Sequence, residues 1–200
     1  MYLMKALDLT KIRKPYFGYE DIARVRGIGL DSAKTAASRY VRHGILVRVR
    51  RNLYVLREVW NAADREDKLR LANLGQSPSY VSLMTALDYY DLTTQMQRDV
   101  FESVAVKRTK ELRVNGSVFR YSRIDETLYF GFIRHNGFFI ALPEKALIDA
   151  VYLMSYGRYA LDIAALEAGK LDRERIQRLS RAFPSRTRIR LKKYGYLSTA

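Results

Sequence analysis

The feature that most constrains the fold is the order in which short helix and strand patterns follow one another between positions 19 and 56. Residues 19–26 have the apolar spacing of a short helix, and Gly27-Ile28-Gly29 then forms a tight turn. A further helix is predicted from residue 30 or 31 to residue 43, and Gly44 is the glycine that ends it. The pattern therefore predicts two helices joined by a short glycine turn.

Two short strands are predicted after these helices. Residues 45–50 alternate apolar and basic side chains, Arg51-Asn52 makes a turn, and residues 53–56 return as the second strand. Another helix, over residues 2–13, is predicted to come first. Helix, helix, glycine turn, helix and two-stranded ribbon is the order of a winged helix-turn-helix.

The rest of the chain predicts an α+β domain with a mainly antiparallel sheet and flanking helices. Residues 57–63 are expected to form a linker to it. Expected helices cover residues 64–74, 80–90, 144–154, 160–168, 172–183 and 185–194. Expected strands cover residues 100–106, 112–114, 117–124, 128–133 and 137–141, with tight turns at Asn115-Gly116 and His135-Asn136-Gly137. The predicted domains are 1–60, the winged helix-turn-helix, and 61–200, which ends in a basic helical tail.

Positive charge is concentrated at the two ends of the chain. Residues 1–60 carry a net charge of +8, residues 170–200 carry +8, and the residues between them carry −1, within a total of +15. Two cationic surfaces on a neutral scaffold are typical of a protein whose partner is a phosphate backbone.

Composition excludes several other classes of protein. The chain has no cysteine and two histidines, which excludes a disulfide framework, a zinc finger and a thiol nucleophile. We therefore expect no metal, no cofactor and no catalytic residue. There is no secretory signal and no apolar window of about 18 residues, so we expect a cytoplasmic protein without a membrane partner.

The predicted helix after the glycine turn has two different faces. Its apolar face holds Ala33, Ala36, Ala37, Tyr40 and Val41. Its polar face offers hydroxyls and arginines, which suit base edges in a DNA major groove. The candidates for base reading are Ser32, Lys34, Thr35, Ser38 and Arg39. The alternative is an ordinary amphipathic helix with a solvated arginine side.

The end of this helix and the predicted ribbon supply candidates for phosphate or minor-groove contacts. These candidates are Arg42, Arg48, Arg50, Arg51 and Asn52. Arg48 and Arg50 are two residues apart and so point to one face of the strand. The alternative is that edge charges only prevent strands from aggregating, and three arginines in four positions exceed that need.

The C-terminal tail forms a second basic surface, for which we select Arg175, Arg178, Arg186, Arg188, Arg190, Lys192 and Lys193. Extension of the DNA-binding surface, RNA binding, contact with an acidic protein and simple solvation all remain open. Tyr152 and Tyr156 are interpreted as packing residues rather than base-stacking platforms.

Clustered charges elsewhere give little support to an enzyme. Glu144 lies in the first turn of its helix, and Lys145 and Asp149 have the spacing of an i,i+4 ion pair, which favours a structural role. Asp99, Glu102 and Lys107 fit no metal-nuclease spacing.

Three segments of the sequence resemble the AbiEi-type antitoxins of bacterial and archaeal type IV toxin–antitoxin systems. They are the ribbon region Gly44-Ile45-Leu46-Val47-Arg48-Val49-Arg50-Arg51-Asn52-Leu53-Tyr54-Val55, then Tyr80-Val81-Ser82-Leu83-Met84-Thr85-Ala86-Leu87, and then Leu142-Pro143-Glu144-Lys145-Ala146-Leu147-Ile148-Asp149-Ala150. Their order and spacing match the family from about residue 10 to residue 155.

The resemblance implies a transcriptional autorepressor whose N-terminal domain binds double-stranded DNA at inverted repeats upstream of its own operon. It also implies a C-terminal domain that counters a nucleotidyltransferase-like toxin, without need of a stable complex with it. The chain is then a monomer or a weak dimer. A stand-alone regulator without a toxin, or an RNA-binding module, is the alternative.

Overall fold

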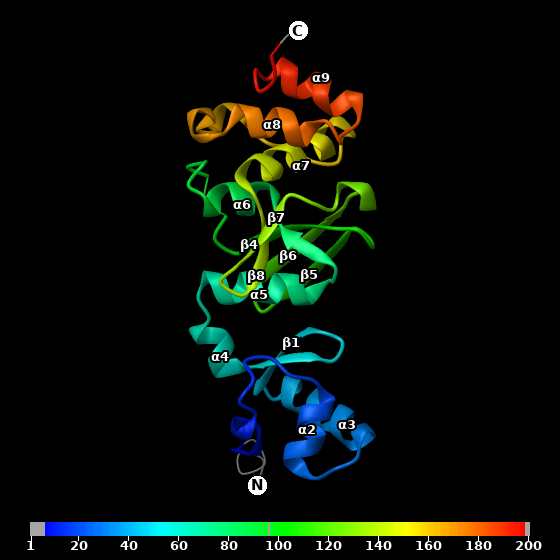
Figure 1. Cartoon of the computed structure of the whole chain (residues 1–200). Helices are drawn as coiled ribbons and strands as arrows, with labels where there is room; N and C mark the ends of the chain where they lie inside the picture. Colours follow the sequence, from blue (N-terminus) through cyan, green and yellow to red (C-terminus); the bar gives the residue numbers. More distant parts are fainter. Residues whose placement is uncertain (1–6, 96, 199–200) are drawn as a thin grey trace. The chain divides into compact units, whose positions relative to one another are not determined.

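The computed structural model describes residues 7–95 and 97–198 of the chain. It divides into two compact units, Met1–Asp67 and Lys68–Ala200, and the boundary falls inside helix α5 (Arg65–Gly75) (Figure 1). The domain boundary taken from the sequence lies slightly earlier in the chain, and the separate roles of the two parts stay a prediction.

The first unit has the predicted order of helices and strands. It contains the 3₁₀ turn η1 (Leu7–Lys11), the helices α2 (Tyr19–Arg26), α3 (Leu30–Arg42) and α4 (Arg57–Ala62), and the strands β1 (Leu46–Arg50) and β2 (Leu53–Leu56). Gly44 has a φ of 72° after α3, and the N–H of Ile45 donates to the carbonyl of Tyr40, so the helix ends in the glycine-based cap that the sequence predicts.

Two expectations for the first unit are wrong. A helix is expected over residues 2–13, but the described residues of this segment form only the short 3₁₀ turn η1. Residues 2–6 lie outside the described part of the chain. The linker expected over residues 57–63 is instead helix α4, because Trp60 is buried where α4 packs against the ribbon of β1 and β2.

Small side chains on α3 determine how the first unit packs. Ala33, Ala36 and Ala37 are buried with Tyr40, and α3 contacts both α2 and β1. The rest of this core comes from η1, α2 and the ribbon, together with Phe17, whose backbone pairs with that of Tyr54. The apolar face predicted for this helix is thus the buried one.

The second unit is built on a six-stranded mixed sheet with the strand order β5-β6-β4-β3-β8-β7. The strands are β3 (Ser79–Val81), β4 (Val100–Ala105), β5 (Lys110–Val114), β6 (Ser117–Arg123), β7 (Phe132–His135) and β8 (Phe138–Ala141). The pairs β5·β6, β3·β4 and β7·β8 are antiparallel, whereas β4·β6 and β3·β8 are parallel. Together with the antiparallel ribbon of the first unit, this confirms the α+β class.

Helices lie on both sides of this sheet (Figure 1). On one side are α6 (Leu83–Tyr89), α7 (Pro143–Ser155), α8 (Arg173–Ser180) and α9 (Ser185–Lys193), and α7 contacts the other three. On the other side α5 is held by Tyr121, whose hydroxyl donates to the Ala72 carbonyl at 2.6 Å. The sheet is therefore covered on two faces.

Three predicted elements of the second unit differ in type or start from the structure, and the helix expected over residues 172–183 ends early, at Ser180. The helix expected over residues 80–90 begins only at Leu83, because Tyr80 and Val81 pair with the distant strands β4 and β8. The strand expected over residues 128–133 is the 3₁₀ turn η2 (Glu126–Leu128) followed by a loop and β7. The helix expected over residues 160–168 is replaced by the 3₁₀ turns η3 (Ile163–Ala165) and η4 (Ala168–Lys170).

A buried polar network joins α7 to the centre of the sheet. Lys145 and Asp149 are fully buried and form an ion pair within α7, and the Nζ of Lys145 also donates to the Tyr80 hydroxyl at 2.6 Å. The carboxylate of Asp149 accepts from the hydroxyls of Tyr80 and Ser82, each at 2.9 Å. Burial lowers the pKa of Lys145 and raises that of Asp149, and the ion pair opposes both shifts. The predicted i,i+4 pair is confirmed, and it belongs to the core.

Removing one member of this pair should be far more damaging than removing both. Lys145→Met leaves the Asp149 carboxylate buried without its cation, so the free energy of unfolding should fall by about 3–5 kcal/mol. The double variant Lys145→Met/Asp149→Leu should recover most of that loss, because no charge is then left buried. Urea unfolding followed by circular dichroism measures both values, and equal losses in the two variants would contradict a coupled pair.

Candidate nucleic-acid interface

The structure places every candidate on α3 at its solvent face. Burial of the alanines turns the opposite side of the helix outward, so these side chains share one exposed surface. The exposed residues are Ser32, Lys34, Thr35, Ser38, Arg39 and Arg42.

Local bonds set what this face of α3 offers to a ligand. The Lys34 Nζ lies 2.8 Å from Asp31 Oδ1, and this hydrogen bond holds the pKa of Asp31 below its usual value. The hydroxyls of Thr35 and Ser38 donate to helix carbonyls four residues earlier, at 3.0 and 3.1 Å, and keep lone pairs for accepting. Within the described residues Arg39 and Arg42 have no ion-pair partner. These two guanidinium groups are therefore the main donors of the face.

The ribbon presents a second group of exposed cations. Arg48, Arg50 and Arg51 are exposed, whereas Val47 and Val49, which alternate with the first two, are buried, as the sequence predicts. The pairing register shifts between Arg48 and Arg50, which indicates a bulge in β1. One nitrogen of Arg50 donates to the Arg51 carbonyl at 3.1 Å, so this side chain is held along the tip.

Asn52 differs from the other candidates because its side chain is used inside the unit. Its Oδ1 accepts from the backbone N–H of Tyr19 at 2.6 Å, and its Nδ2 donates to the Glu20 carboxylate at 3.1 Å. Its φ of 56° is a left-handed conformation that asparagine tolerates well. A Cβ atom at position 18 would lie only 2.7 Å from Asn52 Oδ1, and the residue there is a glycine, which has none. Asn52 thus fixes the tip of the ribbon to the first turn of α2.

The second basic surface is only partly exposed. Arg178, Arg186, Arg188, Lys192 and Lys193 are exposed, whereas Arg175 and Arg190 are half-buried. A guanidinium nitrogen of Arg175 lies 3.4 Å from the buried carboxylate of Glu144. The guanidinium group of Arg190 donates to the Met154 carbonyl at the end of α7. These two residues hold α8 and α9 against α7, so the remaining five form the exposed surface.

The carboxylates considered for catalysis do not come together. Asp99 is exposed, and its Oδ1 lies 3.6 Å from the Nζ of Lys68. Glu102 is buried, and its carboxylate accepts a hydrogen bond from the Tyr159 hydroxyl at 2.7 Å. Burial raises the pKa of Glu102 despite this bond. Glu144 caps the start of α8 by accepting from the Asp172 N–H at 3.2 Å. In residues 7–95 and 97–198 there is no cluster of histidine or acidic residues suited to a metal ion.

Sequence reasoning passed over Leu30, the first residue of α3. Its side chain is 50% exposed although it is apolar, and it lies beside the polar face of the helix. An apolar group at the start of a recognition helix can contact a thymine methyl. Its position directly after Gly29, at the predicted helix start, was the available signal.

The first unit is a winged helix-turn-helix, the class of domain that places one helix in a DNA groove. Residues 4–57 match the family model described as "Transcriptional regulator, AbiEi antitoxin". Over this segment the resemblance to AbiEi-type antitoxins, which are DNA-binding transcriptional regulators, is confirmed. The match ends at residue 57, so the resemblance in the second and third segments stays a prediction.

A solved structure is similar over most of the chain. The crystal structure of the RV2827C protein from Mycobacterium tuberculosis aligns with 98% of this chain and 80% of its own, with a TM-score of 0.56 and 15% sequence identity. At this identity the likeness concerns the fold alone. No curated protein matches the sequence. No helix in the described part of the chain is long and apolar enough to cross a bilayer.

Loss of the Asn52 side chain should loosen the ribbon. Asn52→Ala removes the acceptor for Tyr19 N–H and puts alanine in a left-handed conformation, so the free energy of unfolding should fall by about 1–3 kcal/mol. Asn52→Gly loses the same hydrogen bonds but keeps the backbone conformation and should be the milder variant. Thermal unfolding compares the two, and wild-type stability in both would contradict the role assigned to Asn52.

Proposed function

We propose that the chain is a sequence-specific DNA-binding autorepressor and the antitoxin of a type IV toxin–antitoxin system. The observation that carries the proposal is the exposed polar face of α3 beside a ribbon with three exposed arginines. The family match over residues 4–57 supports it. The neutral hydroxyls and arginine forks of α3 suit base edges, and the ribbon suits phosphates.

In this proposal α3 lies in the major groove of the operator. Arg39 donates to base acceptors such as the O6 and N7 of guanine, while Ser32, Lys34, Thr35 and Ser38 complete the base-reading face. Arg42, Arg48, Arg50 and Arg51 contact phosphates or the minor groove. Asn52 acts by fixing the tip of the ribbon, since its amide is already bonded inside the unit.

The operator is proposed to be a pair of inverted repeats upstream of the chain's own operon. A weak dimer or two monomers placed next to each other would give each repeat one winged helix-turn-helix. The protein acts in the cytoplasm, where this DNA lies. The second unit, which is not proposed to be an enzyme, counters a nucleotidyltransferase-like toxin and needs no stable complex with it.

Binding to its own upstream DNA is the first test of this function. Fluorescence anisotropy should give tighter binding to a duplex from upstream of the operon than to a scrambled duplex at every salt concentration. Equal affinities that fall steeply with salt would contradict a specific repressor. Preference for single-stranded or folded RNA would support the RNA-binding alternative instead.

Arg39→Ala should lower base discrimination. The loss of a bidentate contact to a base should cost about 1–3 kcal/mol on the operator and much less on the scrambled duplex, because only the operator offers the matching base. The same anisotropy measurement gives both changes. An equal loss on the two duplexes would reject Arg39 as a base reader.

Arg50→Ala should weaken binding to both duplexes by similar factors. Removal of one phosphate contact should lower the slope of log K against log salt by about one. Arg113→Ala is the matched control, because it removes an exposed arginine that pairs with Glu111 at 2.7 Å on β5 of the second unit. An unchanged slope in Arg50→Ala would exclude the phosphate contact.

A further inference from the structure

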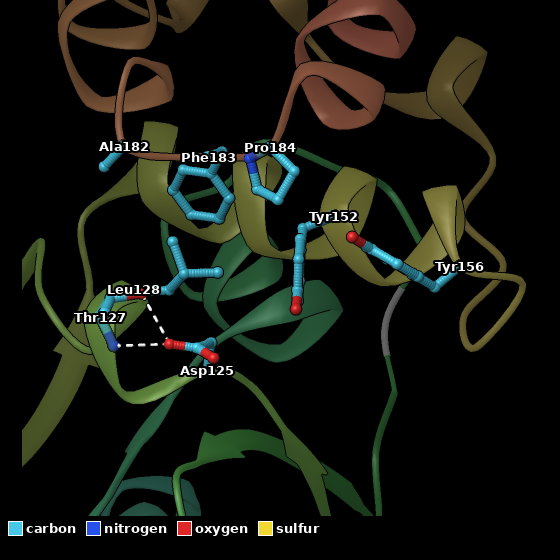
Figure 2. Close-up of a pocket in the computed structure, with 8 residues that line it drawn as sticks. All are labelled: Asp125, Thr127, Leu128, Tyr152, Tyr156, Ala182, Phe183 and Pro184. Atoms are coloured by element: carbon cyan, nitrogen blue, oxygen red, sulfur yellow. Dashed lines mark hydrogen bonds between the residues drawn. The ribbon is translucent and has the colours of Figure 1, made fainter.

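The second unit contains a pocket with a volume of about 380 Å³. It lies between η2, the end of α7 and the turn that joins α8 to α9 (Figure 2). Six of its eight lining residues are aromatic or apolar, and the two polar ones come from the loop around η2. The lining residues are Asp125, Thr127, Leu128, Tyr152, Tyr156, Ala182, Phe183 and Pro184.

The aromatic side chains of this wall pack against one another and against the core. Phe183 is 2% exposed, and its ring packs edge-on against Tyr152 at 5.8 Å between centroids. Behind it, the Nζ of the buried Lys145 lies 5.1 Å from the centre of the Phe183 ring. Tyr156 continues the wall toward solvent and is 44% exposed. Tyr156 is therefore the ring that this wall offers to a flat ligand, and Tyr152 and Phe183 support it from behind.

Two exposed arginines lie over the rings of Tyr152 and Tyr156. The guanidinium carbon of Arg158 lies 5.6 Å from the centre of the Tyr152 ring and 5.4 Å from the centre of the Tyr156 ring. The guanidinium carbon of Arg186 lies 5.3 Å from the centre of the Tyr156 ring. Arg186 is in the first turn of α9, which has no acidic residue and no side-chain cap. Both cations and the positive end of α9 favour an anionic group at this rim.

The loop around η2 supplies a hydrogen-bond acceptor. Asp125 Oδ1 accepts from the backbone N–H and the hydroxyl of Thr127, at 3.0 and 2.6 Å. These bonds hold the pKa of Asp125 below its usual value, so the carboxylate is charged at neutral pH. Its Oδ2 accepts no hydrogen bond from any described residue. This oxygen is available to an N–H group of a ligand in the pocket.

We propose that this pocket binds a nucleotide. The base lies against Tyr156 at the rim, with the buried rings of Tyr152 and Phe183 packed behind it. An amino or ring N–H of the base donates to Asp125 Oδ2, and the phosphate lies on Arg158 and Arg186. A flat ring, an N–H donor and an adjacent anion are what these three groups of side chains complement together. Stacked duplex DNA cannot insert a base here, so the ligand is a free mononucleotide or an unpaired nucleotide of a strand. This site is separate from the operator-binding surface proposed for the first unit.

Isothermal titration calorimetry on the full chain tests the proposal. The four ribonucleoside 5′-monophosphates and a uridine trinucleotide are titrated in turn, with 2′-deoxyribose 5-phosphate as a probe that lacks a base. We expect saturable binding of at least one monophosphate and none of the sugar phosphate. Tighter binding of the trinucleotide than of the monophosphates would identify the source as a strand, and equal binding would identify a free nucleotide.

Matched variants locate the ligand. Arg186→Ala should weaken nucleotide binding about tenfold through loss of a charge-assisted hydrogen bond. Arg188→Ala removes another exposed arginine of the same helix, one that lines a different pocket and is not stacked on Tyr156 as Arg186 is, and it should leave binding unchanged. Tyr156→Leu keeps an apolar side chain at the rim and should also weaken binding, while Asp125→Asn can keep the bond to Thr127 and should alter the preference among bases. Circular dichroism checks that each variant is folded.

Two results would overturn the proposal. One is the absence of saturable binding by every nucleotide and by the trinucleotide. The other is an equal loss in Arg186→Ala and Arg188→Ala, which would show that the ligand follows the general positive charge of α9 rather than the pocket.

Discussion

Close packing of the alanine face of α3 is the constraint on which the first unit depends. Ala33, Ala36 and Ala37 have side chains small enough for α2 and the ribbon to approach α3 closely, and their burial fixes which side of the helix faces solvent. The hydroxyls and arginines on that side are therefore presented together as one surface. Asn52 also fixes the position of the ribbon tip relative to α2. As a result, α3 and the ribbon form one interface.

The core of the second unit contains a buried ion pair, Lys145–Asp149. This pair is satisfied within the core by Tyr80 and Ser82. Such a pair adds little net stability, but the observed arrangement of α7 on the sheet keeps both buried charges paired. That arrangement also fixes Phe183 against Lys145, and so shapes the wall of the aromatic pocket. Core electrostatics and the proposed ligand site are thereby linked.

Local patterns predicted the first unit well and the second less well. The bounds of α2, the buried face of α3 and the turn at Asn115-Gly116 depend on residues close in sequence, so periodicity and glycine placement identified them. The strand β3 depends instead on pairing with β4 and β8, which no local pattern contains. The role of Asn52 likewise depends on a partner 33 residues away. The structure leaves most of the candidate side chains in solvent but half-buries Asn52, Arg175 and Arg190, and all contacts with DNA stay predictions.

The most direct test of the account is to locate α3 on DNA by affinity cleavage. The chain has no cysteine, so Leu30→Cys at the start of α3 and Ile189→Cys on α9 each give a single attachment point for an iron–EDTA probe. The account predicts that the probe at residue 30 cuts the upstream DNA at each inverted repeat, in the offset pattern of a major-groove source, and does so more strongly than the probe at residue 189. Uniform cutting from residue 30, or stronger cutting at the repeats from residue 189, would contradict the account.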